Sequence, residues 1–280
     1  MHTRGRARRF LGGCLLLAVA SCLWISVLAL YLHGELPPPT EPTGPVLKAR
    51  GNLVLDITDA SDGFLMARCL SDDGVRRKLR IEKDDKIYTY DINTSGEYEV
   101  YPLQMGSGSY TCTLYRNIRG YLYAEDGAIR LDVALSGEHA PFLRPSQYVN
   151  YGADSPAVLK AAELCRGLET DAEKLEAIRS FLVESFSYDY ARARTIKGGY
   201  LGDIDGVFES KTGLCQDLAA IAACMLRAQG IPAQMALGRV DGRYHAWNYV
   251  LIDGEYRFLD VTGEISGIGR DAVYTPERYY

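Results

Sequence analysis

The pattern of apolar and polar residues divides the chain into an apolar N-terminal stretch, a region of β-type alternation and a region of helical periodicity. In the second region, apolar and polar residues alternate over 78–82 and 129–135, as in strands with one buried face. Short apolar runs bounded by Asp, Gly, Asn and Ser predict further strands over 64–70, 87–92, 98–103, 110–115 and 121–124. Short strands at this spacing indicate an all-β, sandwich-like domain over residues 51–140.

After Ser136 the spacing of apolar residues becomes helical. Helices are predicted over 155–166, 170–186 and 213–229, and Thr170 with Glu173 forms a capping box at the start of the second. Residues 187–210, rich in Tyr and Gly, are expected to form a loop. Asp-Gly turn signals separate strands predicted over 233–240, 244–252 and 255–261. Helices followed by an antiparallel sheet predict an α+β domain over 141–280.

An uncharged stretch runs from Phe10 to Leu32 and follows four arginines, Arg4, Arg6, Arg8 and Arg9. As a helix it would extend roughly 34 Å, at about 1.5 Å per residue, which is enough to cross the hydrocarbon core of a membrane. We therefore predict a cytoplasmic stub and an uncleaved signal-anchor transmembrane helix over 1–33. The alternatives are a cleaved signal peptide and a lipoprotein signal in which Cys22, in Val-Ala-Ser-Cys, becomes acylated.

All three interpretations place the rest of the chain outside the cytoplasm. The four arginines keep the N-terminus inside by the positive-inside rule. Five of the 11 prolines lie between Pro37 and Pro45, which predicts a semi-rigid linker over 34–50. The expected location is the cell membrane, with a single-pass anchor and the C-terminal domains outside the cytoplasm.

Composition and charge exclude several classes of protein. Of the 280 residues, 47% are apolar and 24% are charged, which is typical of a folded globular chain and excludes a disordered or collagen-like one. The net charge of -5 provides no basic surface, so no nucleic-acid partner is expected.

The seven cysteines are an odd number, so pairing in an oxidising compartment would leave at least one free thiol. Cys69 and Cys112 lie in predicted strands, and Tyr110 precedes Cys112 by two residues, as at the tyrosine corner of immunoglobulin domains. One hypothesis is a disulfide between Cys69 and Cys112, and the alternative is two buried thiols. Because no tryptophan lies between them, a true immunoglobulin domain is not expected.

Cys215 is a candidate nucleophile. It lies at the start of the predicted helix 213–229, where free amide groups and the helix dipole stabilise a thiolate. Its base must be one of two histidines, since the other two flank the apolar N-terminal stretch. His139 lies in the loop between the predicted domains, whereas His245 lies in a predicted strand.

Asp260, in the strand that follows, can lie beside His245 and fix its imidazole tautomer. Each of the three residues also has a structural explanation. A cysteine in an apolar helix is usually a core residue, a strand histidine beside tryptophan usually packs, and an aspartate at a strand end commonly caps a turn. Their combination and order favour a site.

Three motifs resemble the core of the transglutaminase-like superfamily, which has the papain-like cysteine-protease fold. They are Lys-Thr-Gly-Leu-Cys215-Gln-Asp-Leu-Ala, Tyr-His245-Ala-Trp-Asn and Phe-Leu-Asp260-Val-Thr. The resemblance covers about 155–280, and Leu-Arg followed by Gly-Ile-Pro after the first motif is similar to exported bacterial members. It implies a papain-like core of helices and antiparallel sheet in this part of the chain.

The resemblance also implies a catalytic triad of Cys215, His245 and Asp260. Cys215 would attack an amide carbonyl, His245 would take and return protons, and Asp260 would orient His245, with a thioacyl-enzyme as the intermediate. One oxyanion donor would be the backbone amide of Cys215, and Tyr200 is the candidate for the second.

Three neighbours of these residues have supporting roles in the same resemblance. Asp217 would be a charge at the helix start, and Trp247 and Asn248 would shape the site beside His245. No cofactor and no metal are expected. Asp203-Ile-Asp205-Gly206 is the nearest approach to a calcium loop, and its spacing fits a turn equally well.

The function that follows is that of a membrane-anchored extracytoplasmic cysteine-dependent acyl-transferase or hydrolase. Its partners would be a protein or peptide substrate, attacked at an amide group, and the membrane, bound through the N-terminal helix. Two alternatives remain: a cysteine peptidase without amine transfer, and a catalytically inactive binding scaffold.

Overall fold

The computed structural model describes residues 44, 46–269 and 271–280. These residues belong to one compact unit. The predicted signal-anchor helix and most of the predicted linker lie outside the described residues. Among the helices that the structure describes, none combines the length and the apolar character that a membrane crossing requires.

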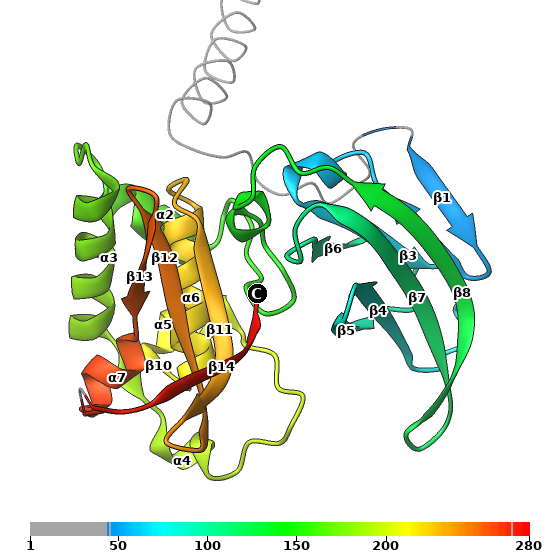
Figure 1. Ribbon diagram of the computed structural model, residues 1–280. Coiled ribbons are helices and arrows are strands. Elements are labelled where there is room, and N and C mark those ends of the chain that lie inside the picture. The colour runs from blue at the N-terminus through cyan, green and yellow to red at the C-terminus, as the bar shows by residue number, and fades with distance from the viewer. Residues whose placement is uncertain (1–43, 45, 270) are drawn as a thin grey trace, which may run out of the picture. The chain divides into compact units, whose positions relative to one another are not determined.

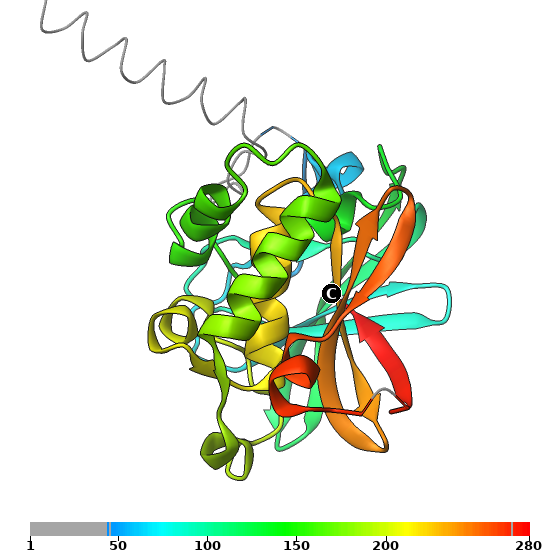
Figure 2. The same cartoon turned by 90° about the vertical axis from the view of Figure 1, so that its left-hand side faces the viewer.

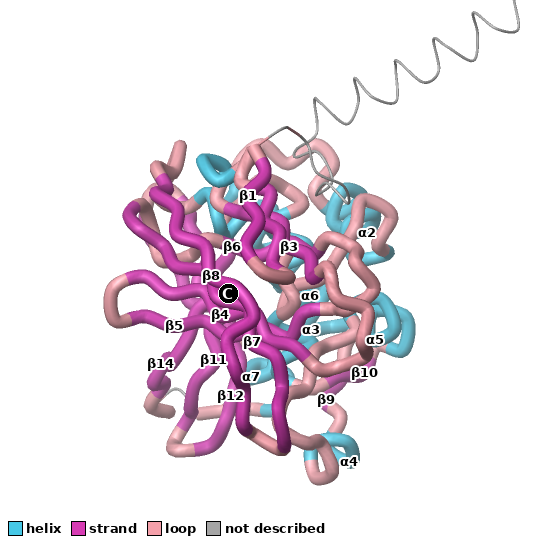
Figure 3. Tube along the Cα trace, turned by 90° about the vertical axis from the view of Figure 1, so that its right-hand side faces the viewer, coloured by secondary structure: helices cyan, strands magenta, loops and turns pink. Residues whose placement is uncertain are grey.

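The N-terminal half contains two four-stranded sheets, whose strands lie together in Figure 3. All of their pairings are antiparallel. One sheet has the order β1-β2-β3-β6, formed by Leu47–Arg50, Leu53–Asp56, Phe64–Cys69 and Glu99–Pro102. The other has the order β5-β4-β7-β8, formed by Lys86–Ile92, Arg77–Lys83, Gly108–Arg119 and Leu122–Val133. The prediction of an all-β region is confirmed, although β1 begins inside the segment assigned to the linker.

Gly127 explains why β8 looked like two strands in the sequence. The strands predicted over 121–124 and 129–135 form one strand that pairs with β7 almost throughout. A Cβ at Gly127 would lie 2.0 Å from the carbonyl oxygen of Arg50, and its φ of +142° also favours glycine. The glycine that suggests a break therefore permits the β1–β2 turn to approach β8 closely.

Tyr110 forms the tyrosine corner that its spacing suggested. Its hydroxyl lies 3.0 Å from the carbonyl oxygen of Leu103 and 2.7 Å from that of Gly106, both a few residues upstream. The side chain is buried among the strands of the sandwich. The motif therefore fixes a β corner here without the tryptophan of an immunoglobulin domain.

The hypothesis of a Cys69–Cys112 disulfide is wrong. Both thiols are free and buried, as are the other cysteines that the structure describes. Cys69 ends β3 and its Sγ contacts the backbone of Ser71, whereas Cys112 lies in the middle of β7 opposite Ile81. The two residues therefore behave as small core side chains.

The C-terminal half has helices on one side of a sheet, as Figure 2 shows. Its antiparallel sheet has the order β13-β12-β11-β14, formed by Glu255–Leu259, Arg243–Ile252, Ala233–Val240 and Tyr274–Tyr279. The central helix α6, Cys215–Arg227, is buried along its whole length between the sheet and two outer helices. These are α2, Pro156–Leu164, and α3, Asp171–Ser185, which begins with the predicted capping box at Thr170. The predicted α+β architecture is confirmed.

Part of the segment predicted as a loop is ordered into short elements. Residues 187–210 contain β9, Ser187–Tyr188, and the helices α4, Tyr190–Ala193, and α5, Ile204–Ser210. Strand β9 pairs in parallel with β10, Thr212–Gly213. Two further elements, α7 over Val261–Ser266 and the strand β14, are also absent from the prediction.

Tyrosine rings join the two halves. Tyr280 stacks on Tyr148 with ring centroids 3.9 Å apart, and its ring edge meets Tyr88 of β5 at 5.5 Å. Tyr90 of the same strand lies 6.3 Å from Tyr280. Because Tyr148 also lines the cavity beside Cys215, one wall of that cavity is connected to the β half through Tyr280.

Arg227 at the end of α6 is fully buried and donates hydrogen bonds to backbone carbonyl groups around it. Its Nε and Nη2 donate to the carbonyl oxygen of Ala233 at 3.0 and 2.7 Å, and Nη1 donates to that of Arg144. We expect Arg227→Met to lower the free energy of unfolding by roughly 3 kcal/mol, because buried carbonyls lose charged donors. Urea unfolding measures this change. Arg166→Met, at an exposed arginine, serves as the control, and an equal loss in both variants would contradict the assignment.

Candidate active site

Cys215 is the first residue of α6 and is 8% exposed. The helix begins here because Asp217 Oδ2 accepts a hydrogen bond from the backbone N–H of Leu214, the N-cap residue, at 2.9 Å. The backbone amides of this first turn have no partners within the helix, so they and the helix dipole favour negative charge at the sulfur.

Packing of α6 on β12 brings His245 towards Cys215. The side chain of Asn248, three residues after His245, donates to the carbonyl oxygen of Ala219, one turn after Cys215, at 3.1 Å. Asn248 is fully buried. It therefore fixes the helix and the strand to each other close to Cys215 and His245.

Asp260 holds the ring of His245. It follows the last residue of β13, which pairs with β12, and its Oδ2 lies 2.8 Å from His245 Nε2. Tyr274 donates its hydroxyl to the same oxygen at 2.7 Å, and the backbone N–H of Gly263 donates to Oδ1 at 2.8 Å. The carboxylate is thus the N-cap of α7 and the partner of the imidazole at once.

The surroundings of His245 favour its charged form. Burial alone would lower its pKa, but hydrogen bonds to Asp260 and to Cys215 outweigh burial and raise the pKa to about 9. Because Asp260 takes Nε2, the ring turns Nδ1 to the cysteine. The geometry therefore places an imidazole that is charged at neutral pH beside the thiol of Cys215.

This pKa makes stability depend on pH. A folded-state pKa of about 9, above the ordinary 6.5, gives a stabilisation that is complete below pH 6.5 and is lost as the pH rises to 9. We expect roughly 1–3 kcal/mol of the free energy of unfolding to disappear over this window. Urea unfolding at several pH values measures it. His245→Gln should remove this part of the slope, and an unchanged slope would refute the assignment.

A cavity of about 400 Å³ opens beside Cys215. Four tyrosines, the segment before α5 and the start of α6 form its walls, and the lining residues are Tyr148, Tyr188, Ala193, Ile196, Lys197, Gly198, Gly199, Tyr200, Leu214, Cys215, Gln216 and Tyr244. The cavity is therefore aromatic, with the thiol on one wall. Its size suits a few residues of an extended chain.

Tyr200 lines this cavity, but its hydroxyl proton is engaged within the protein and is not free for the predicted oxyanion role. Its hydroxyl donates to Asp217 Oδ1 at 2.7 Å. Asp217 is fully buried, and burial raises its pKa against the effects of Tyr200 and the Leu214 amide. Asp217 thus lies at the helix start, as predicted. It also accepts a hydrogen bond from Tyr200 of the cavity, a role that the sequence did not indicate.

Tyr188 of β9 is the tyrosine with a free hydroxyl near Cys215. Within the part of the chain that the structure describes, its hydroxyl has no hydrogen-bond partner, and its ring packs against Tyr190 at 4.9 Å. Burial and then the charge of Cys215 raise the pKa of Tyr188, so the phenol remains a proton donor at neutral pH. Nothing in the sequence distinguishes Tyr188 from the other tyrosines near it.

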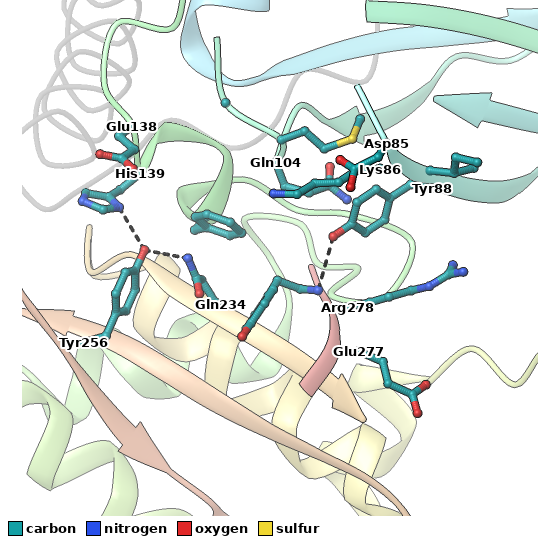
Figure 4. A pocket seen from close by; sticks show the side chains of 15 residues that line it. Asp85, Lys86, Tyr88, Gln104, Glu138, His139, Gln234, Tyr256, Glu277 and Arg278 are labelled. Atoms are coloured by element: carbon teal, nitrogen blue, oxygen red, sulfur yellow. Dashed lines mark hydrogen bonds between the residues drawn. The ribbon is translucent and has the colours of Figure 1, made fainter. Parts of the chain in front are cut away.

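His139, the other histidine in the described residues, belongs to a different cavity (Figure 4). This cavity of about 800 Å³ lies between the β half and the sheet β13-β12-β11-β14. There His139 Nδ1 is hydrogen-bonded to the hydroxyl of Tyr256 at 2.9 Å, and Gln234 donates to that hydroxyl at 2.7 Å. Cys215 does not line this cavity, so His139 is not placed to act as its base.

Trp247 is fully buried beside His245, with ring centroids 6.1 Å apart and nearly parallel rings. Its ring limits the movement of the imidazole on the face that it covers. Asp203 of the acidic loop caps α5 by accepting from Gly206 N at 3.0 Å, which is the turn role. Among the described residues, no group of three or more His, Cys, Asp or Glu side chains could hold a metal ion.

Residues 160–261 match the model of the transglutaminase-like superfamily. This segment contains Cys215, His245 and Asp260, and the match confirms the resemblance seen in the three motifs. The fold of this segment supports cysteine-dependent chemistry in general. No curated protein matches the sequence significantly.

Several solved structures are similar at low sequence identity. A candidate cysteine protease from Cytophaga hutchinsonii is 16% identical with a TM-score of 0.38, over 74% of this chain and 79% of that one. A candidate protease from Parabacteroides distasonis is 19% identical with a TM-score of 0.33, over 67% and 38%. Red sea bream transglutaminase is 14% identical with a TM-score of 0.30, over 80% and 50%. This chain therefore spans half or less of the last two.

Proposed function

We propose that the chain is a membrane-anchored, extracytoplasmic cysteine acyl-transferase or hydrolase of the transglutaminase-like type. Its substrates would be amide groups of proteins or peptides. The observation that supports this most is the position of His245, which Asp260 holds at Nε2 while its other side meets Cys215 in the wall of an open cavity.

The reaction would proceed in two halves. Cys215 Sγ attacks the carbonyl carbon, the C–N bond breaks, and His245 gives its proton to the leaving amine, which leaves a thioester. An amine or water then enters, gives a proton to His245 and attacks the thioester, so that the C–S bond breaks and the thiolate returns. Asp260 keeps the imidazole in place through both halves.

The negative oxygen of each tetrahedral intermediate needs donors. The backbone N–H of Cys215, in the first turn of α6, is one donor. We assign the second to the hydroxyl of Tyr188, because it lies beside the same cavity and is free, whereas Tyr200 is engaged by Asp217. Tyr188→Phe should then lower kcat with little change in KM, and unaltered kcat would exclude this role.

Transfer and hydrolysis are separated by one experiment. The full chain in detergent is incubated with peptides, with and without a fluorescent primary amine. Amine incorporation that disappears in Cys215→Ala supports transfer, whereas cleavage or deamidation alone supports a hydrolase. Cys165→Ala is the matched control, because that thiol is buried at the end of α2 and outside the cavity.

The inactive scaffold is the competing function. It requires that Cys215 react with iodoacetamide no faster than other thiols and that no substrate be turned over. Hydrogen bonding of His245 to both Asp260 and Cys215 favours an active enzyme, since a binding module has no need for this arrangement.

We also propose that residues 10–32 anchor the chain in the membrane with the C-terminal part outside. The sequence supports this through the uncharged stretch and the four preceding arginines. Protease added to intact cells should digest the C-terminal part while the N-terminus stays protected. Full protection of both ends, or release of the protein by alkaline washing, would refute the anchor.

A further inference from the structure

The segment 190–203 forms one wall of the cavity and is fastened to the residues that follow Cys215. The Tyr200 hydroxyl donates to Asp217 Oδ1 at 2.7 Å, and Gln216 Nε2 donates to the carbonyl oxygen of Tyr200 at 2.8 Å. Both the side chain and the backbone of one tyrosine are thus tied to the first turn of α6. These two hydrogen bonds therefore fix the position of the segment 190–203 relative to Cys215.

Positive charge gathers on this wall, although the whole chain has a net charge of -5. Residues 190–203 contain Arg192, Arg194 and Lys197, and their one acidic residue, Asp203, caps α5 and does not line the cavity. Arg192 is used within the protein, since it stacks on the Tyr200 ring at 4.9 Å and lies 4.0 Å from the buried carboxylate of Asp217.

Lys197 is the cation that the cavity offers to a ligand. It is the lysine among the lining residues, which include no aspartate or glutamate, and its ammonium has no carboxylate partner among the described residues. Next to it, Gly198 and Gly199 have open space where a Cβ would stand. A substrate can therefore approach this wall closely and bring an anionic group to Lys197.

We propose that Lys197 selects acyl donors that carry a carboxylate beside the reacting carbonyl group, and that Tyr200 positions the wall that carries Lys197. The substrate class is an acidic peptide. This inference rests on the proposed function, because the donor is defined by its attack at Cys215. Attraction of this kind acts on productive binding and is weakened by salt.

The test uses three blocked dipeptide p-nitrophenyl esters that differ only in the residue beside the ester, which is Glu, Gln or Lys. Activated esters report acylation without requiring the natural leaving amine. With the full chain at low salt, kcat/KM should fall in the order Glu, Gln, Lys, with about threefold to fivefold between neighbours. High salt should reduce the differences in kcat/KM among the three esters.

Two variants of Lys197 and one control complete the test. Lys197→Gln should make the Glu and Gln esters equal, and Lys197→Glu should reverse the order. Lys86→Gln, an exposed lysine that lines the other cavity, should leave the wild-type order intact. Equal rates for all three esters, or an order that persists in Lys197→Glu, would overturn the inference about Lys197 but would leave the proposed enzymatic function standing. Absence of any Cys215-dependent release would instead overturn the proposed function.

Tyr200→Phe tests the positioning role. Loss of the hydrogen bond to Asp217 should raise KM for the Glu ester about threefold or more, with kcat changed less than twofold, and should shrink its advantage over the Gln ester. A fall in kcat alone, or an unchanged preference, would show that Tyr200 does not act through Lys197.

Discussion

His245→Ala should lower the rate of acyl-enzyme formation by about 10⁴-fold, since one side chain supplies both the base and the acid of the reaction. The ring bonds to Asp260 at Nε2 and meets Cys215 on its other side. Without it the thiol of Cys215 loses the base that takes its proton and the thiolate loses its counter-charge, and both losses slow attack on an ester, whose nitrophenolate leaves without protonation. The measurement is the pre-steady-state burst of nitrophenol from an activated ester.

His139→Ala is the matched control, because it removes the other histidine of the described residues. That ring is bonded to Tyr256 in the second cavity, so its loss should leave the burst within twofold of the wild type. If the burst survives in His245→Ala, or if it depends on His139, then His245 is not the base.

Asp260→Asn should lower kcat/KM by about 10²–10⁴-fold, while the free energy of unfolding should fall by no more than the roughly 1–3 kcal/mol that the raised pKa of His245 contributes. Asparagine caps helices as well as aspartate does, so the bond from Gly263 N that begins α7 can be kept. The amide, however, carries no charge and can present N–H to His245 Nε2, which favours the wrong tautomer. The variant therefore separates orientation of the imidazole from folding.

The pH profile gives a second observation on the same variant. In the wild type, rates should fall as the pH rises through about 9, where the imidazolium loses its proton. Asp260 contributes to that raised pKa, so in Asp260→Asn the fall should move to lower pH. Tyr274→Phe removes one donor to Asp260 and should have a much smaller effect. Equal losses in the two variants would mean that the carboxylate has no special role.

The sequence predicts well those helices and strands whose signals lie within the element itself or directly beside it. The sequence predicts strand β11 and helix α3 within a residue or two, because the strand is bounded by turn signals and the helix begins with a capping box. The order of the three motifs likewise sufficed to indicate the nucleophile, the base and the carboxylate. Their assignment as a catalytic triad stays a proposal, as does the division into domains at residue 140.

The elements that were missed depend on partners far along the chain. Helix α7 has six residues, and the Asp260 cap and the Arg179–Glu264 ion pair from α3 hold it. Strand β14 contains Pro276, which weakens its strand pattern, and its hydrogen bonds go to β11. Nor can the sequence say that the Tyr200 hydroxyl goes to Asp217 rather than to an oxyanion, because that depends on how 190–203 folds over α6.

Peptide mapping of the acylated protein tests the central claim most directly. The full chain is mixed with an activated peptide ester, quenched in acid and digested, and the mass of each cysteine peptide is measured. We expect the acyl group on Cys215 alone, released by hydroxylamine, absent in Cys215→Ala and strongly delayed in His245→Ala. Acyl groups spread over Cys69, Cys165 and Cys215 alike, or none on Cys215, would contradict a cysteine acyl-enzyme at this site.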